Sequence, residues 1–249
     1  MANHFPLRLI GSRMLAPSVR HLEFARDDGL PLDFIPGQFI QVHFNYPDGT
    51  ATKRSYSLAT VHDHALGPGE AVEIAVSYVA GGAATALFTA LDEGQQIQAS
   101  GPYGRFCLGA GDSNARYLLI GTGTGVTPYR AMLPQLAQMM AARDVDVVML
   151  FGARTPAELI YGEDFYAFAS AHPRFRFVPC FSRELPADAH ADVRRGYVQD
   201  ALAEFAPDAA GDIAYLCGNP NMVDTAFEAL KSAGLPVPHI RREKYVSSK

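Results

Sequence analysis

The spacing of hydrophobic residues changes near residue 110, and this change constrains the fold more than any other feature of the sequence. Before it, apolar and polar residues alternate in short runs such as GQFIQVHF (37–44) and AVEIAVSYV (71–79), separated by turns rich in Gly, Pro and Asp. Alternation with period two is typical of strands with one buried face, so this part predicts an antiparallel β-barrel or sandwich.

After residue 115 the strands are expected to be buried on both faces. Solid apolar runs occur at YLLI (117–120), VDVVML (145–150), FRFVPCF (175–181) and IAYLC (213–217), with helix-length segments between them. Buried strands that alternate with helices predict a parallel α/β sheet. Because GAGDSNAR (109–116) suits a linker, we predict a β-barrel domain over residues 1–112 and an α/β domain over residues 113–249.

Composition excludes several kinds of partner and cofactor. The 249 residues are 48% hydrophobic and carry a net charge of −5, with no basic excess in either half, so nucleic acid is not an expected partner. No run approaches the ~20 apolar residues of a membrane span, and we expect a cytoplasmic protein without a membrane partner. Cys107, Cys180 and Cys217 lie too far apart in sequence to suggest a metal or iron–sulfur site. Redox chemistry would therefore require an organic cofactor.

Three glycines at alternate positions, Gly121, Gly123 and Gly125, follow the first buried strand. Thr127 and Pro128 come next and predict the N-cap and first residue of a helix. A strand, a glycine turn and a helix N-terminus bring backbone N–H groups close to a diphosphate. The segment 121–125, including Thr122 and Thr124, is therefore a predicted diphosphate loop, although no acidic residue ends the second strand to hold a ribose.

The segment RSYS (54–57) places a cation, a ring and two hydroxyls on an expected strand. Alternation puts Arg54 and Tyr56 on one face and Ser55 and Ser57 on the other. From these residues alone, an ordinary strand with a half-exposed tyrosine is a better explanation than a ligand site.

Six motifs together resemble those of ferredoxin–NADP reductases, most closely the bacterial members. In the order of that family they are RSYS (54–57), GGAAT (81–85), GPYG (101–104), GTGTGVTP (121–128), CGNPNMV (217–223) and EKY (243–245). The resemblance implies an FAD-binding antiparallel β-barrel followed by a parallel-sheet α/β domain that binds NADP. It also implies an enzyme that exchanges hydride with NADP(H) and single electrons with ferredoxin or flavodoxin, and we expect a monomer.

The resemblance assigns most of the flavin site to RSYS and GGAAT. It implies that Arg54 pairs with the FAD diphosphate, that Tyr56 lies against the flavin, and that Ser57 offers its hydroxyl to flavin N5. The FAD ligands that follow from these two motifs are Arg54, Ser55, Tyr56, Ser57, Ala84 and Thr85.

The remaining catalytic residues are assigned to the end of the chain. By resemblance, Cys217 lies near the reacting nicotinamide carbon, Glu243 lies near the hydride path, and Tyr245 covers the flavin face until nicotinamide displaces it. The plant-type pattern ends at this ring, whereas here VSSK (246–249) follows it. The extension could reach the FAD adenine or slow displacement of the ring, and the sequence leaves both options open.

The choice between NADP and NAD depends on residues after the third α/β strand. A 2′-phosphate carries close to two negative charges, which a hydroxyl and one or more arginines would favour. Ser182 and Arg183 are the first candidates, Arg195 and Tyr197 the second, and Arg154 a further one, whereas Arg194 is given no role.

Three other functions remain open. The chain could be an NAD(P)H:flavin reductase that releases reduced flavin, or a flavoprotein redox sensor without turnover. It could also be the reductase component of an oxygenase, but such chains usually carry a fused iron–sulfur domain, and three dispersed cysteines are expected to exclude one.

Overall fold

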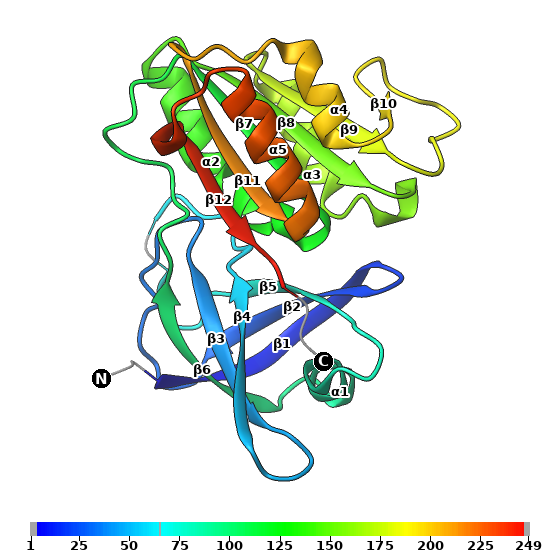
Figure 1. The fold of residues 1–249 in the computed structure, drawn as a ribbon. Coiled ribbons are helices and arrows are strands. Elements are labelled where there is room, and N and C mark those ends of the chain that lie inside the picture. Colours follow the sequence, from blue (N-terminus) through cyan, green and yellow to red (C-terminus); the bar gives the residue numbers. More distant parts are fainter. Residues whose placement is uncertain (1–3, 65, 247–249) are drawn as a thin grey trace. The chain divides into compact units, whose positions relative to one another are not determined.

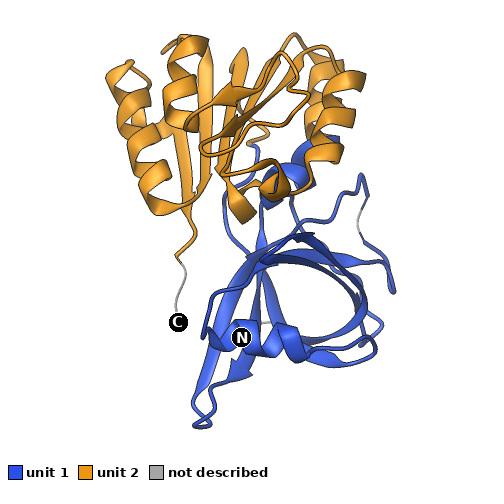
Figure 2. Cartoon of the chain, turned by 90° about the vertical axis from the view of Figure 1, so that its right-hand side faces the viewer, with its two compact units in different colours: residues 1–108, 127–134, 247–249 blue, residues 109–126, 135–246 orange. Residues whose placement is uncertain are grey.

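The computed structural model describes residues 4–64 and 66–246 and divides into two compact units (Figure 2). The first unit contains residues up to 108 together with 127–134, and the second contains 109–126 and 135–246. Each unit is built on one six-stranded sheet (Figure 1). Within the described ranges, no helix has the length and apolar character needed to cross a bilayer.

The first unit is an antiparallel β-barrel with one short helix. Its strand order is β4-β3-β6-β1-β2-β5, and a bridge between Leu58 and Ile74 joins the two ends of this order. Alternate residues of β1, including Phe5, Leu7 and Leu9, point into the core, as the period of two predicts. The elements are β1 (His4–Ala16), β2 (Val19–Arg26), β3 (Phe39–Asn45), β4 (Ala51–Ser57), β5 (Val72–Ser77), α1 (Ala83–Ala90) and β6 (Gln96–Tyr103).

The second unit is a parallel sheet with the order β10-β9-β8-β7-β11-β12. Apolar residues of α4 and α5 share a core with alternate residues of the central strands on one face. On the other face, Phe165 of α3 contacts Phe151 and Phe177. Burial of both faces explains why these strands are solid apolar runs in the sequence.

The elements after residue 115 are β7 (Arg116–Thr122), η1 (Gly123–Val126), α2 (Thr127–Ala142), β8 (Asp146–Ala153), η2 (Pro156–Glu158), α3 (Gly162–Ala171), β9 (Phe175–Phe181), β10 (Arg194–Arg195), α4 (Val198–Leu202), η3 (Ala203–Phe205), β11 (Asp212–Gly218), α5 (Pro220–Ser232), η4 (Val237–His239) and β12 (Ile240–Lys244). The four η elements are 3₁₀ helices. Helix α2 contributes its first half to the first unit and its second half to the second.

The start of α2 differs from the sequence prediction. Gly123–Val126 form a 3₁₀ helix that runs directly into α2, so that Val126 is the N-cap and Thr127 is already helical. The prediction of Thr127 as the N-cap is therefore wrong. Glycine spacing cannot distinguish an open turn from a 3₁₀ turn, because glycine adopts either conformation at little cost.

Candidate functional site

The Arg54 side chain is held in place by neighbouring residues of the β3–β4 hairpin. Its guanidinium donates to Thr52 Oγ1 at 2.9 Å, to the Lys53 carbonyl at 2.9 Å and to the Tyr46 hydroxyl at 2.8 Å. These bonds use three of the five N–H donors of an arginine. The group is thus oriented and still has donors for an anion.

Tyr56 connects β4 to helix α1. It pairs with the buried Ile40 of β3, and its ring packs edge to face on Phe88 of α1, with 5.3 Å between centroids and 87° between planes. Desolvation raises the pKa of the Tyr56 hydroxyl. The two serines of the motif differ in environment, since Ser57 is buried and Ser55 is exposed. Tyr56 is therefore a fixed ring of the kind that a stacked cofactor requires.

The N-terminus of α1 has the geometry of an anion site. The chain turns at Gly81, whose φ is +73°, and the N-cap residue Gly82 has no side chain to occupy the first-turn N–H groups. Ala84 lies in this turn, which contains no acidic residue. The Thr85 hydroxyl accepts from the Val79 N–H at 2.8 Å and keeps its own O–H as a donor. This helix end fits a diphosphate.

The opposite end of α1 is held by Arg20, a residue that the sequence analysis did not identify. From β2, its guanidinium donates to the Phe88 carbonyl at 2.5 Å, to Ser12 Oγ at 2.7 Å and to the Leu91 carbonyl at 3.3 and 3.4 Å. The last turn of α1 contains no basic residue. Arg20 therefore supplies the positive charge that the C-terminal carbonyls of the helix favour.

The chain immediately after RSYS is also fixed by a distant arginine of the same unit. Arg130 donates to the Ala59 carbonyl at 2.6 Å and forms an ion pair with Glu73 at 2.5 Å. The Glu73 carboxylate also lies 3.7 Å from the buried His21. The segment that follows Ser57 is consequently tied to strand β5 through charged groups.

In the second unit, the predicted diphosphate loop is one continuous turn. Gly121 and Thr122 end β7, and Gly123, Thr124 and Gly125 lie in η1. No side chain caps the N-terminus of α2 that follows. The N-terminus of α2 is thus free of a side-chain cap, as a phosphate site requires.

Two glycines bring this turn against the end of β11. A Cβ atom on Gly125 would lie 2.3 Å from the Cys217 carbonyl oxygen, and one on Gly218 would lie 2.5 Å from the Thr122 carbonyl oxygen. Both neighbouring atoms belong to the backbone and cannot rotate away. The backbones of the two loops are therefore in direct contact, and no other residue fits at either position without displacing them.

Cys217, Glu243 and Tyr245 lie together at the carboxyl ends of β11 and β12. Cys217 pairs with Glu243 across the two strands, and the Tyr245 N–H donates to the Gly218 carbonyl at 2.8 Å. Cys217 is fully buried, and burial raises the pKa of its thiol well above the usual value. The nearby Glu243 charge raises this pKa further, and a hydrogen bond with Tyr245 partly opposes the rise. Cys217 is therefore a neutral thiol.

The segment that carries Tyr245 is anchored to α5. Lys244 forms an ion pair with Asp224 at 2.6 Å, and the Arg242 guanidinium lies 3.9 Å from the centre of the Phe227 ring. These contacts hold the last strand up to Tyr245. Val246 is exposed, and the remaining residues of the predicted extension, Ser247–Lys249, lie outside the described residues.

Most candidates for the 2′-phosphate lie together at the carboxyl edge of β8, β9 and β10. The Ser182 N–H donates to the Ala153 carbonyl at 3.1 Å, and the Arg183 N–H donates to the Arg154 carbonyl at 2.9 Å. Arg195 pairs with Phe181, the residue before Ser182. The fifth candidate, Tyr197, has 60% of its surface exposed at the N-terminus of α4. The structure therefore brings Ser182, Arg183 and Arg154 together, with Arg195 on the adjacent strand.

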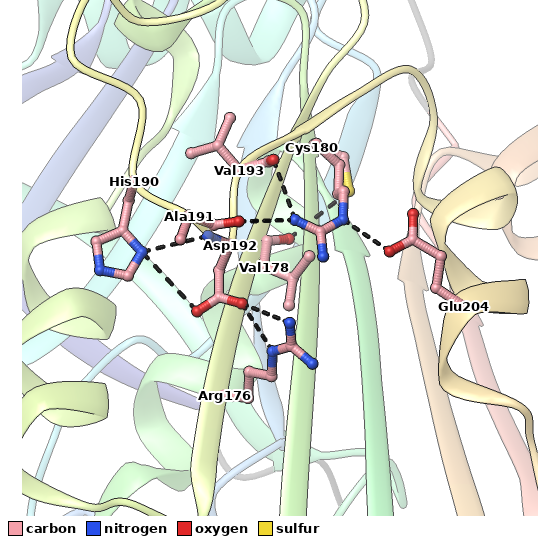
Figure 3. A network of polar contacts seen from close by, with 9 residues as sticks. Arg176, Val178, Cys180, His190, Ala191, Asp192, Val193 and Glu204 are labelled. Carbon is pink, nitrogen blue, oxygen red and sulfur yellow. Dashed lines mark hydrogen bonds and ion pairs between the residues drawn. The ribbon is translucent and has the colours of Figure 1, made fainter.

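Arginines in this region differ in whether an acid neutralises them. Arg176 pairs with Asp192 at 2.6 Å, and Arg194 pairs with Glu204 at 2.8 Å (Figure 3). Arg154 is held by Glu158, whereas Arg183 and Arg195 form no ion pair with any residue of the described chain. Arg194 is therefore neutralised within the protein, and the two arginines without an acidic partner in the described chain are the ones suited to bind an external anion.

Glu158 is a further residue that was not predicted from the sequence. No acidic residue directly ends β8, as the sequence indicated, but the 3₁₀ turn η2 brings Glu158 back to Arg154, the first residue after that strand. An acid four residues from an arginine is a local signal that could have suggested this pair. The carboxyl edge of β8, β9 and β10 therefore carries a carboxylate as well as arginines.

These features fit two nucleotide ligands. The uncapped α1 terminus with Arg54 suits the diphosphate of FAD, and the glycine turn with the unpaired arginines suits a nicotinamide dinucleotide. A β-barrel with the first site and a parallel α/β unit with the second define a flavin-dependent oxidoreductase that uses a nicotinamide nucleotide.

Comparisons with known proteins identify the family. The model of the oxidoreductase FAD-binding domain matches residues 6–107, and that of the oxidoreductase NAD-binding domain matches residues 119–228. Ferredoxin–NADP reductase B of Sorangium cellulosum is 36% identical over 98% of this chain and 98% of its own length. The chain therefore belongs to the ferredoxin reductase family, as the six motifs predicted.

Relatives of this chain also include reductase components of oxygenases. The propane 2-monooxygenase reductase component of Rhodococcus jostii is 33% identical over 86% of this chain, and this chain spans 56% of that protein's length. The structure of the Amycolatopsis cytochrome P450 reductase GcoB superimposes with a TM-score of 0.84 at 30% identity, covering 98% of this chain and 70% of that one. The family thus includes proteins with different electron acceptors.

Proposed function

We propose that this chain is a ferredoxin–NADP(+) reductase that binds FAD in its barrel and exchanges electrons between NADP(H) and ferredoxin or flavodoxin. The observation that carries the proposal is the pair of arginines without an acidic partner in the described structure, Arg183 and Arg195, beside Ser182. Guanidinium groups bind a phosphate dianion well, and NAD has no 2′-phosphate for them to bind. The 36% identity to a ferredoxin–NADP reductase along the whole chain supports the same function.

In this proposal the barrel binds and orients FAD. Arg54 and the α1 terminus, including Ala84 and Thr85, hold the diphosphate, Tyr56 packs on the flavin, and Ser57 donates a hydrogen bond to N5, with Ser55 at the edge of this site. Bound FAD supplies a ring that takes up two electrons as a hydride and releases them one at a time.

The second unit binds and positions the nicotinamide nucleotide. The turn 121–125 holds the diphosphate, and Ser182 with Arg183 and Arg195 holds the 2′-phosphate. Cys217 contributes a small neutral side chain beside the nicotinamide, Glu243 places a charge near the path of the hydride, and Tyr245 covers the flavin face when nicotinamide is absent. The exposed Tyr197 can stack on the adenine.

An anaerobic titration followed by visible absorption tests the proposal. NADPH should bleach the flavin completely, and NADH should require a far higher concentration. The reduced protein should then reduce cytochrome c only when ferredoxin or flavodoxin is added. Bleaching by NADH at equal or lower concentration, or failure of both carriers, would contradict the proposal.

A second candidate, the reductase component of an oxygenase, is favoured by the relatives that carry that name. Such a component would pass its electrons to a partner protein of the oxygenase system rather than to a general carrier. A flavin reductase is a third option and would lose FAD during gel filtration. If the protein keeps its FAD and reduces cytochrome c only when ferredoxin or flavodoxin is present, the proposed function is distinguished from the oxygenase component and from the flavin reductase.

A further inference from the structure

We propose that Glu158 is a specificity-determining residue that weakens the preference of the nucleotide site for NADP(H) by neutralising Arg154. This inference rests on the proposed function, because it concerns the 2′-phosphate subsite. The arginines of this subsite are proposed to bind the phosphate, whereas Glu158 is proposed to oppose its binding.

The Glu158 carboxylate engages Arg154 with both of its oxygens. Oε2 accepts from Arg154 Nε at 2.8 Å and from the Arg154 backbone N–H at 3.2 Å, and Oε1 pairs with the terminal guanidinium nitrogen. The short 3₁₀ turn Pro156–Glu158 produces this geometry by returning the chain to the strand end. Both oxygens of the carboxylate are thus engaged, and Arg154 is oriented toward Glu158 before any nucleotide binds, while its remaining guanidinium donors are left for an anion.

The same carboxylate acts on the neighbouring unpaired arginine. The backbone N–H groups of Arg183 and Glu184 donate to the Arg154 carbonyl at 2.9 and 3.2 Å, so the two arginines are on adjacent segments. The pKa of Glu158 is lowered, mainly by its hydrogen bonds with Arg154, and the Arg183 charge adds to this effect. Glu158 is therefore ionised at neutral pH, and its charge reduces the positive potential that both arginines create.

This charge distinguishes the two nucleotides. A 2′-phosphate that binds the remaining donors of Arg154 brings a dianion close to the Glu158 carboxylate, and the repulsion between the two anions opposes its binding. NADH brings only a hydroxyl to this position, which an acid tolerates and can accept a hydrogen bond from. Glu158 therefore penalises NADP(H) relative to NAD(H), and the chain should use both nucleotides more evenly than its arginines alone would allow.

The Arg194–Glu204 pair provides a matched control. It is also an arginine–glutamate pair, with a distance of 2.8 Å, and its glutamate side chain is 49% exposed, against 27% for Glu158. Arg194 is directed to Glu204 on η3 and to the carbonyls of Ala191 and Val193 (Figure 3). Removing the Glu204 charge therefore frees an arginine that is not part of the proposed phosphate subsite.

Calorimetric titration of the FAD-loaded protein tests the inference. The probes are adenosine 2′,5′-bisphosphate, which carries the 2′-phosphate, and 5′-AMP, which lacks it. Glu158→Gln should tighten binding of the bisphosphate about three- to tenfold, an effect that shrinks at high salt because exposed charges are screened. Binding of 5′-AMP should change less than about twofold, since an exposed ion pair alone contributes little. Glu204→Gln should leave both affinities unchanged.

The outcomes separate this inference from the proposed function. If Glu158→Gln leaves bisphosphate binding unchanged or weakens it while Arg183→Gln also weakens it, the subsite is correct and the role of Glu158 is not. If Arg183→Gln has the same effect on both probes, the 2′-phosphate subsite itself is misplaced and the proposed NADP preference fails with it. The glutamine keeps the size of the side chain and an oxygen for the Arg154 N–H, and the circular dichroism and flavin absorption of each variant verify its fold.

Discussion

Replacing Arg20 by methionine should loosen helix α1 and weaken the binding of FAD that we propose for its N-terminus. The side chain makes two short hydrogen bonds, to the Phe88 carbonyl at 2.5 Å and to Ser12 Oγ at 2.7 Å, and longer ones to the Leu91 carbonyl. Hydrogen bonds to a charged group contribute about 1.5–3 kcal/mol each, and we use the lower end of this range because both groups are only part-buried, with about 0.5 kcal/mol more from the helix C-terminus. The expected loss is thus about 3.5 kcal/mol in the free energy of unfolding.

The loss in the free energy of FAD binding should be smaller than the loss in the free energy of unfolding. Arg20 contacts the C-terminal end of α1, and only the resulting fraying of the helix reaches its first turn. We expect the dissociation constant of FAD to rise about tenfold, equivalent to about 1.4 kcal/mol. Urea unfolding of the flavin-free protein measures the first quantity, and flavin fluorescence on titration measures the second. Arg20→Lys keeps the charge without the planar fork and should recover part of both.

Arg8→Met is the matched control, since Arg8 is an arginine of the same barrel with an exposed ion pair to Asp27 at 2.9 Å. An exposed pair contributes about 0–1 kcal/mol, and this variant should retain FAD normally. The reasoning is refuted if Arg20→Met costs no more stability than Arg8→Met, or if it unfolds more easily while FAD affinity stays within twofold of the parent.

Further predictions concern Arg54, the cysteines and Tyr245. Arg54→Ala should weaken FAD binding by about 1.5–3 kcal/mol if its guanidinium contacts the diphosphate, and unchanged retention on ultrafiltration would remove it from the site. Because burial raises the pKa of Cys217, its proton is bound more tightly in the folded protein, so stability should be complete below about pH 8.5 and fall as the pH rises further, as pH-dependent urea unfolding would show. Iodoacetamide at pH 8.5 should accordingly modify the half-buried Cys107 and spare Cys217, as read by peptide mass spectrometry. Tyr245→Ser should tighten nicotinamide binding and relax the preference for NADPH together in stopped-flow reduction, and unchanged kinetics with both nucleotides would mean that the ring does not cover the flavin.

The sequence was sufficient to predict the two architectures because each leaves a distinct hydrophobic period. A barrel strand such as β1 buries alternate residues, and β11 is buried along its whole length. The glycine turn after β7 and the helix that follows it were also predictable, since glycine and proline mark such positions strongly. The local sequence pattern predicted an element wherever the interactions that determine that element are between residues close in sequence.

Features that depend on distant contacts could not be predicted in this way. Arg20 and Phe88 are separated by 68 residues, and Arg130 and Glu73 by 57, so no local pattern identifies either pair. The N-cap of α2 was misplaced because a 3₁₀ turn and an open turn share the same glycine spacing. The Arg154–Glu158 pair lies within one turn of chain, but its importance is visible only when Arg183 is seen on the adjacent segment.

The contact between the backbones at Gly125 and Gly218 has a consequence for how nucleotide loops can be exchanged among proteins of this architecture. Each glycine leaves space for a carbonyl of the opposite loop, that of Cys217 in one direction and that of Thr122 in the other. If only one loop were transplanted, it would lack either the glycine that leaves space for the opposite carbonyl or the carbonyl that occupies that space. The sequences GTGTG and CG therefore form a single module, which protein engineers would have to graft as a pair although 91 residues separate Gly125 from Cys217.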